Sequence, residues 1–188
     1  MSSPERQPDL EGRFELVDGP VPPGLEAFVM RISGYREHGG GPVRMVEIAS
    51  LVVPLVIGFD APFEIALGRD PLPGDRYASF TAGLCAGPVT IRSPGRAHCI
   101  QVNFTPLGAH RFFGVPMHAL ADRMVRLDDL GDRALAALRE RLGEQRSWAG
   151  RFALVDDFLR ARLLAAPAPS AATAWAYGAI TASGGRIP

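Results

Sequence analysis

A run of four polar residues, Tyr35, Arg36, Glu37 and His38, follows one predicted strand and precedes a glycine-rich turn. Phenol, guanidinium, carboxylate and imidazole groups at such a place could orient a small molecule, because a few fixed polar groups give a binding cavity its specificity. The alternative is a solvated loop with surface ion pairs, which are common and weak. Both interpretations stay open at this point, and we predict that these four residues contact a ligand.

Four further polar residues lie on neighbouring predicted strands. Arg44 and Glu47 belong to the strand that follows the glycine turn, where they could face the same rim. Gln101 and Asn103 alternate with the apolar residues of the range 100–104, and alternate side chains of a strand point to opposite faces. Either set could therefore face a cavity, and we predict ligand contacts by all four polar residues.

Metal-dependent chemistry would need several of the four histidines to converge. One type of β-barrel metal enzyme has two His separated by one residue, a Glu shortly after them and a third His on a later strand. His38, His98, His110 and His118 form no such pattern. A lone histidine is more often a surface or core residue, so we predict no metal site and no cofactor.

Nucleophilic and phosphate-binding motifs are also missing. The sequence has no Gly-x-Ser-x-Gly, and no cysteine lies near a helix start with a close histidine. The glycines of 39–41 lack the Lys and Ser/Thr of a phosphate-binding loop and precede a strand, which is typical of a hairpin turn. We predict no catalytic residue, and we expect that the chain is not an enzyme.

Composition limits the possible partners. The 188 residues have a formal charge of zero, with 20 acidic residues against 20 basic ones, all of them Arg. A surface that binds phosphates needs concentrated positive charge, so these residues alone are not expected to hold DNA. Cys85 and Cys99 lie in apolar surroundings without a secretory signal, which predicts buried reduced thiols. The longest apolar run, 51–58, is too short to cross a bilayer; we predict a cytoplasmic protein without a membrane partner.

The elements that must position these residues change type near Phe104. Apolar and polar residues alternate over most of 14–104, and Gly/Pro-rich turns separate the alternating segments, which predicts the short strands of a sandwich or barrel. Pro54 interrupts one apolar run and predicts an edge or bulged strand there. Pro94 and Gly95 suit the centre of a type II turn.

The second part of the chain has helical periodicity. We predict helices over 106–111, 116–122, 130–142, 148–163 and 171–182. Asp128 and Asp129 are expected to cap the third helix, Gly143 to end it, and Ser147 to cap the fourth.

The fourth predicted helix carries an apolar stripe with steps of four, three, four and four residues. Its members are Trp148, Phe152, Val155, Leu159 and Leu163. Such a stripe most often covers the core of its own domain. It could also pack on the same helix of a second subunit in a two-fold dimer. Both interpretations stay open, and we assign these five residues to dimerisation.

Several segments together resemble the N-terminal half of a subset of AraC-family bacterial transcription regulators. The resemblance covers about 13–187 and is carried by 33–37, 44–50, 79–84, 101–109 through 114–116, 127–130, 138–142 and 151–154. It implies a sensing and dimerising half, built as a cupin-like barrel with appended helices. The segment 182–187 resembles the lead-in to a DNA-binding domain with two helix-turn-helix units, which lies outside this chain.

These observations combine into one expectation. We predict an α+β fold, with a flexible arm at 1–12, an antiparallel cupin-like β-barrel or sandwich at 13–125 and a helical dimerisation and linker segment at 126–188. The expected function is that of the effector-sensing, homodimeric domain of an AraC-type regulator, which contacts DNA only through the absent domain. The alternatives are a small cupin-like isomerase or oxygenase, and a dimerisation scaffold whose barrel is filled by its own side chains.

Overall fold

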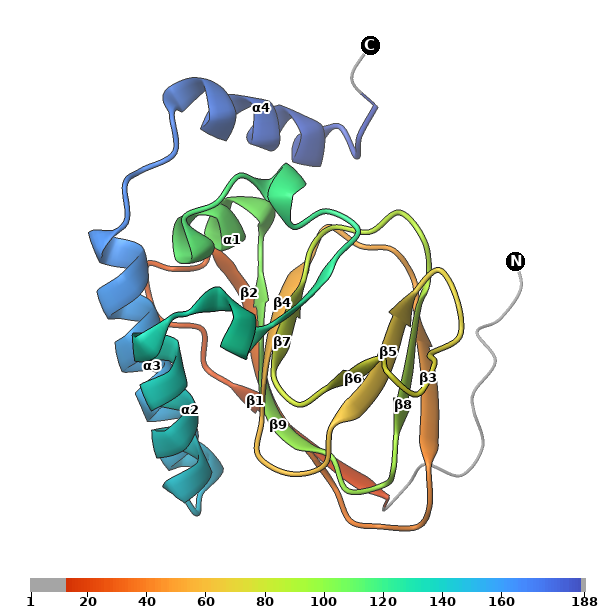
Figure 1. The fold of residues 1–188 in the computed structure, drawn as a ribbon. Coiled ribbons are helices and arrows are strands. Elements are labelled where there is room, and N and C mark those ends of the chain that lie inside the picture. The colour runs from red at the N-terminus through yellow and green to blue at the C-terminus, as the bar shows by residue number, and fades with distance from the viewer. Residues whose placement is uncertain (1–12, 187–188) are drawn as a thin grey trace.

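The strands form two antiparallel sheets in the computed structural model, which describes residues 13–186 (Figure 1). The six-stranded sheet has the order β1 (Phe14–Gly19), β2 (Val29–Glu37), β9 (His98–Phe104), β4 (Val53–Gly58), β7 (Phe80–Ala82) and β10 (Met124–Arg126). The four-stranded sheet has the order β3 (Val43–Glu47), β8 (Val89–Ser93), β5 (Phe63–Leu67) and β6 (Arg76–Tyr77). The predicted arm, 1–12, lies outside the described residues.

The pairing of the strands follows a single rule. Strand β2 pairs with β9, β3 with β8, β4 with β7 and β5 with β6, and successive pairs belong to alternate sheets. A long hairpin folded over in this way is a jelly roll, the double-sheet architecture of cupins. The predicted α+β fold, a cupin-like antiparallel sandwich followed by helices, is therefore confirmed.

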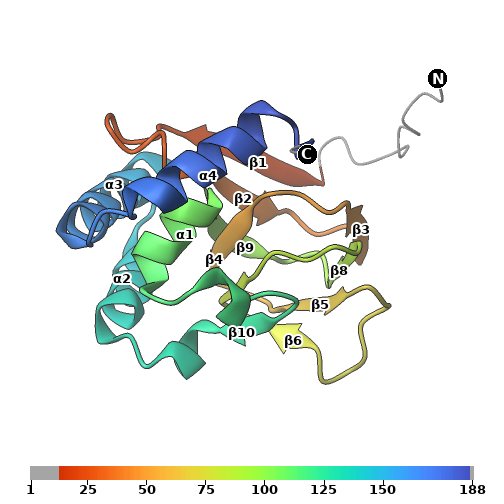
Figure 2. The same cartoon turned by 90° about the horizontal axis from the view of Figure 1, so that it is seen from above.

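Four α-helices of the described chain follow or flank the sandwich. They are α1 (Pro106–Phe113), α2 (Arg133–Glu144), α3 (Trp148–Ala165) and α4 (Ala171–Ala182), with short 3-10 helices at Met117–Ala119 and Leu127–Leu130. Seen from above, α1, α2 and α3 cover the side of the six-stranded sheet that faces away from the four-stranded sheet (Figure 2). The molecule thus has three layers, helices on a sheet on a second sheet.

The largest hydrophobic core lies between the helices and the six-stranded sheet. Residues of β2, β4 and β9 pack there against α1, α2 and α3, and their side chains are almost fully buried. On β9, Ile100, Val102 and Phe104 face this core, so Gln101 and Asn103 must face the interior of the sandwich. The structure thus decides which set of β9 side chains points inward.

Several local predictions need correction. The expected helix over 116–122 is a single 3-10 turn that leads into β10. Asp132, not Asp128 or Asp129, caps α2, because the Asp128 region forms its own 3-10 turn; Ser147 caps α3 as predicted. Strand β4 lies between β9 and β7 and is therefore internal, not an edge strand. It tolerates Pro54 because its pairing with β7 begins only at Leu55.

Two smaller findings complete the fold. Gly95 has φ of 86°, in agreement with the predicted type II turn. Among residues 13–186, no helix has the length and apolar character that a membrane crossing would need.

Candidate ligand-binding site

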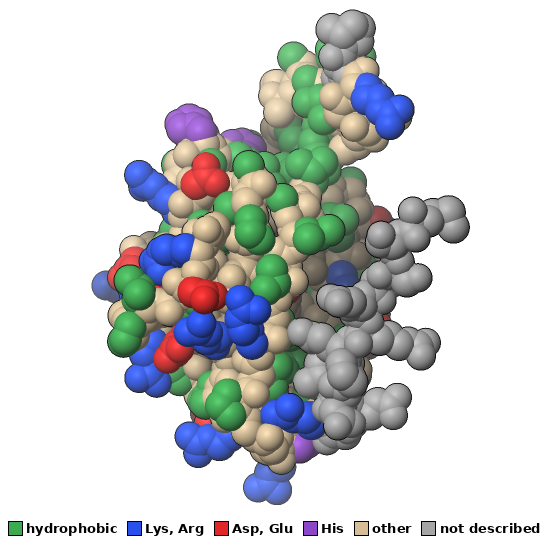
Figure 3. Space-filling view, turned by 90° about the vertical axis from the view of Figure 1, so that its right-hand side faces the viewer, with side chains coloured by type: hydrophobic (Ala, Val, Ile, Leu, Met, Phe, Trp, Pro, Cys, Tyr) green, Lys and Arg blue, Asp and Glu red, His purple; other side chains and the backbone are tan. Residues whose placement is uncertain are grey.

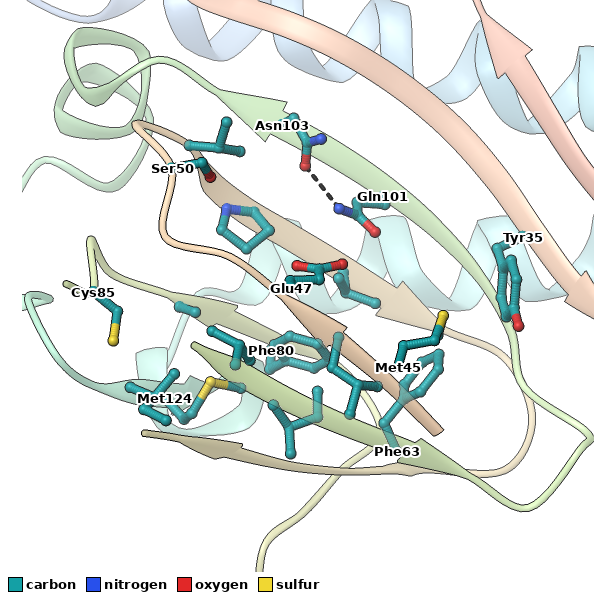
Figure 4. A pocket seen from close by; sticks show the side chains of 18 of the residues that line it. Tyr35, Met45, Glu47, Ser50, Phe63, Phe80, Cys85, Gln101, Asn103 and Met124 are labelled. Carbon is teal, nitrogen blue, oxygen red and sulfur yellow. Dashed lines mark hydrogen bonds between the residues drawn. The ribbon is translucent and has the colours of Figure 1, made fainter. Parts of the chain in front are cut away.

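A cavity of about 440 Å³ lies between the two sheets (Figure 4). Volumes of roughly 300–1,000 Å³ are typical of sites for small molecules. A small apolar cluster that includes Phe63, Phe80 and Cys99 packs against part of its wall. The interior of the sandwich is therefore partly hollow, while the main core lies on the other face of the six-stranded sheet.

Most of the cavity wall is apolar and comes from inward-facing positions of both sheets. Among these residues are Met45, Val56, Phe63, Ile65, Phe80, Ile91 and Met124. Sequence reasoning missed them, although the alternation in β5 and β8 would have placed Phe63, Ile65 and Ile91 on one face. What the alternation could not show is which face encloses a space.

The polar part of the wall is concentrated on β9. Gln101 Nε2 donates a hydrogen bond of 2.8 Å to Asn103 Oδ1, and Figure 4 shows both side chains directed into the cavity. Ser33 lies opposite Gln101 on β2 and is buried. Because Gln101 and Asn103 hold each other in place, they offer a fixed pair of donors and acceptors to an occupant.

Glu47 projects from β3 into the same space (Figure 4). The residue as a whole is exposed, since it lies at the open side of the cavity. Its carboxylate is nevertheless partly desolvated by the surrounding protein, and this burial raises the pKa of Glu47. Contact with water through the opening limits that effect.

Tyr35 also lines the cavity, but its hydroxyl is already engaged. It donates a hydrogen bond of 2.8 Å to Glu37 Oε1. Burial, and to a smaller extent this hydrogen bond, raises the pKa of Tyr35 above its ordinary range. The ring is thus available to an occupant as an apolar surface, whereas the hydroxyl is held by the protein.

Four of the eight predicted ligand residues lie elsewhere. Glu37 is buried and accepts hydrogen bonds from the Ser93 hydroxyl and, at 2.6 Å, from the Ala97 N–H, so it joins β2 to the turn between β8 and β9. His38 is exposed and lies just beyond the end of β2. Glu37 and His38 are therefore outside the cavity wall of the described chain.

The parity of strand positions explains the other two errors. Arg36 follows the inward-facing Tyr35 directly, so its side chain leaves on the opposite face of β2. Arg44 precedes Glu47 by three positions, points outward and forms a 3.2 Å ion pair with Asp70. Tyr35, Glu47, Gln101 and Asn103 are brought together, while Arg36, Glu37, His38 and Arg44 are not.

Both cysteines lie on the cavity wall. Cys99 is fully buried, and burial raises the pKa of its thiol to about 12, so it is a packing residue and not a nucleophile. Cys85 is half-buried, and both are free thiols. No group of three His, Cys, Asp or Glu side chains within residues 13–186 is placed to hold a metal ion.

The stripe assigned to dimerisation is covered by its own chain. Phe152, Val155, Leu159 and Leu163 are buried in the core between α3 and the sheet, and Trp148 packs against that core. The side chains assigned to a subunit interface are therefore engaged in the core of their own chain, with Trp148 half-buried, and dimerisation stays a prediction. The physical reason is that the outer face of the six-stranded sheet is itself apolar and needs a cover.

A histidine on the helix-facing side of β9 takes part in this packing. His98 Nε2 lies 3.0 Å from Arg151 Nη1, and its ring meets Trp148 and Phe59 edge-on. Arg151 is buried and donates from Nε to the Leu142 carbonyl. Burial, followed by the charge of Arg151, lowers the pKa of His98.

The open side of the cavity carries exposed apolar residues. Ile48 and Leu16 both line the cavity, with exposed fractions of 84% and 51%. Figure 3 views the side of the molecule that carries β3 and shows hydrophobic side chains among charged ones on this face. An apolar rim of this kind favours the entry of a molecule with an apolar body.

Comparison with known proteins gives limited matches. A family model described as a domain of unknown function, DUF6597, matches residues 44–126. No curated protein matches the chain. Among solved structures, the chain is similar to an RmlC-like cupin protein from Desulfovibrio desulfuricans, with 17% identity and a TM-score of 0.36 over 56% of this chain and 97% of that one. The cupin-like architecture rests on the strand order of this chain.

Proposed function

We propose that this chain is a sensing domain that binds a small molecule between its two sheets. The observation that carries the proposal is the cavity of about 440 Å³, which is lined by Glu47, Gln101 and Asn103. A domain that only needed stability would fill this space with side chains. The hollow interior also removes the support for a scaffold with a filled barrel.

Strand β9 offers a route from an occupant to the helices. Gln101 and Asn103 face the cavity, while Ile100, Val102 and Phe104 on the same strand pack against the helical layer. A ligand that binds one arrangement of β9 more tightly would shift the packing of α1 and α3. We therefore place the response to the ligand in the helical layer.

The finer part of the proposal is the AraC-type regulator. The resemblance of 13–187 to the regulatory half of such proteins supports it, as does the order of a jelly roll followed by helices. In this role the chain acts as a cytoplasmic homodimer, binds rather than transforms its ligand, and reaches DNA only through a helix-turn-helix domain outside these residues.

A blocked cavity tests the binding function. The probe is N-(2-hydroxyethyl)dansylamide, a neutral dye whose fluorescence rises in apolar surroundings. Ile91→Trp should abolish binding, because Ile91 points into the cavity from β8, whereas Val46→Trp on the outer face of β3 should bind the dye as the unmodified chain does. Equal binding of the dye by the two variants would contradict the proposed function.

The regulator role has a separate test. The reading frame of the gene should continue into a basic segment with two helix-turn-helix units. The whole gene product should then sediment as a dimer and bind its own promoter fragment. A frame without such a segment would leave the sensing domain intact but would overturn the assignment to the AraC family.

A further inference from the structure

The charges on the cavity wall are unbalanced. Its two ionised side chains, within the described residues, are Arg31 and Glu47. Arg31 is already paired with Asp18 at 2.7 Å, and both of these side chains lie at the exposed edge formed by β1 and β2. Glu47 has no ion-pair partner among residues 13–186. Within the described residues, no ion pair therefore compensates the charge of the Glu47 carboxylate.

The surroundings of Glu47 make this charge unfavourable in an unoccupied cavity. Its partner in the β3–β8 register is Val89, and the inward-facing residue before it on β3 is Met45. Partial desolvation without an opposite charge disfavours the ionised carboxylate. A cation at this place would therefore be stabilised, whereas a second anion would be repelled.

The amide pair adds acceptors on the opposite wall of the cavity, because β9 belongs to the six-stranded sheet and β3 to the four-stranded one. Gln101 uses Nε2 to donate to Asn103, and no side chain or backbone group within residues 13–186 donates to Gln101 Oε1, so this oxygen can accept a hydrogen bond from an occupant. Figure 4 shows Glu47, the amide pair and Phe80 around the same cavity. An ammonium group has three donors and no acceptor, so it matches an array made of a carboxylate and an amide oxygen.

The rest of the wall defines the body of the occupant. Phe63, Phe80, Ile65 and Ile91 present apolar surface from both sheets. A cavity of about 150 Å³ holds a benzene ring, so about 440 Å³ accommodates a body of roughly two fused rings with a short side chain. The apolar body of the occupant and its polar end would therefore lie against different parts of the cavity wall.

We infer that the occupant is an amphiphilic amine, with an aromatic or aliphatic body among the phenylalanines and a protonated amino group between Glu47 and Gln101. This inference rests on the proposed function and names the chemical class of its ligand. Carboxylates and phosphates are disfavoured by the negative charge of Glu47, and Arg31, the one arginine on the wall within residues 13–186, is engaged by Asp18 in an exposed ion pair.

Three dyes with the same body test the charge preference. Dansylethylenediamine ends in an amine, N-(2-hydroxyethyl)dansylamide in a hydroxyl group and dansylglycine in a carboxylate. Their dissociation constants are measured by fluorescence at pH 7, where an alkyl amine is protonated. We expect the amine to bind at least about tenfold more tightly than the hydroxyl dye, since hydrogen bonds to charged groups are stronger than neutral ones. The carboxylate should bind most weakly.

Two variants assign the preference to one residue. Glu47→Gln should bind the amine and the hydroxyl dye equally, and unchanged binding of the hydroxyl dye shows that its cavity is still formed. Glu64→Gln is the matched control, because Glu64 lies on β5 between the inward-facing Phe63 and Ile65 and points outward. It should keep the full preference for the amine.

The outcomes separate the two proposals. Equal binding of all three dyes, tightest binding of dansylglycine, or an amine preference that survives in Glu47→Gln would overturn the assigned ligand class while leaving a binding cavity. Absence of binding by every dye would overturn the binding function itself. A tenfold amine preference that disappears only in Glu47→Gln supports both.

Discussion

The indole ring of Trp148 occupies the space that a side chain at Gly34 would need. Gly34 lies in the middle of β2 on the face that the helices cover, and a Cβ built there would overlap the Trp148 ring. Phe152, one turn further along α3, stands in the same relation to Gly19 of β1, where a Cβ would lie 2.6 Å from the ring. Two glycines therefore let α3 approach the sheet closely.

This contact predicts the effect of adding one methyl group. Gly34→Ala should lower the free energy of unfolding by about 1–3 kcal/mol, the usual range for overpacking a well-filled core. Denaturant unfolding measures the change. Gly143→Ala is the control, because nothing lies within 4 Å of the added Cβ in α2 and alanine favours helix. Equal stability of the two variants would show that Trp148 moves aside freely.

Charges in the α3 stripe should unfold the chain and not merely separate subunits. Leu159 is 1% exposed, so Leu159→Asp should cost more than the roughly 2–5 kcal/mol of an alanine substitution, because it also buries a charge. Circular dichroism at increasing temperature reports the loss. Leu164→Asp, at a position 68% exposed on the same helix, should change the stability by less than about 0.5 kcal/mol. A folded, monomeric Leu159→Asp protein would restore the stripe as an interface.

Acidification should weaken the docking of α3 through His98. Burial and the neighbouring charges of Arg151 and Arg36 lower the native pKa of His98 below its ordinary value of 6.5. Between the native pKa and pH 6.5, the unfolded chain therefore binds more protons than the native chain. The contribution of neutral His98 to the stability of the native chain is complete above pH 6.5 and is lost as the pH falls toward its native pKa.

The measurement is the melting temperature between pH 7.5 and pH 5. The fall in melting temperature on acidification should be smaller in His98→Gln than in the parent chain. It should be unchanged in His118→Gln, because the His118 side chain is exposed. Asp60 and Glu15, which raise the pKa of His98, remain in both variants. Identical pH profiles for His98→Gln and the parent would contradict this role.

Glu37 should prove to be a structural residue. Glu37→Gln replaces an oxygen that accepts from Ser93, Ala97 or Tyr35 with a donor, which leaves buried groups unpaired. We expect a loss of roughly 2 kcal/mol in denaturant unfolding with unchanged dye affinity. Glu140→Gln, on the exposed side of α2, should be neutral. Loss of dye binding without loss of stability would return Glu37 to the binding site.

The sequence allowed the layers of the fold to be predicted, because the period of apolar residues changes from two to about 3.6 near Phe104. It did not show where the apolar stripe of α3 would pack. The stripe has the same spacing whether it covers a sheet or a second subunit, and only the apolar outer faces of β2, β4 and β9 decide between them.

Four of the eight residues predicted to contact a ligand line the cavity. Alternation placed Gln101 and Asn103 together, and the same rule, applied strictly, would have separated Tyr35 from Arg36 and Glu47 from Arg44. The buried role of Glu37 could not be predicted, because its partners Ser93 and Ala97 are 56 and 60 residues away along the chain.

The position of the main core on the far side of the six-stranded sheet has an evolutionary consequence. Side chains such as Glu47 and Gln101 lie outside this core, so their exchange would leave the packing between the helices and the sheet in place. Descendants of one ancestor could therefore come to recognise chemically different molecules through a few substitutions each, while the machinery on the opposite side of β9 stayed the same.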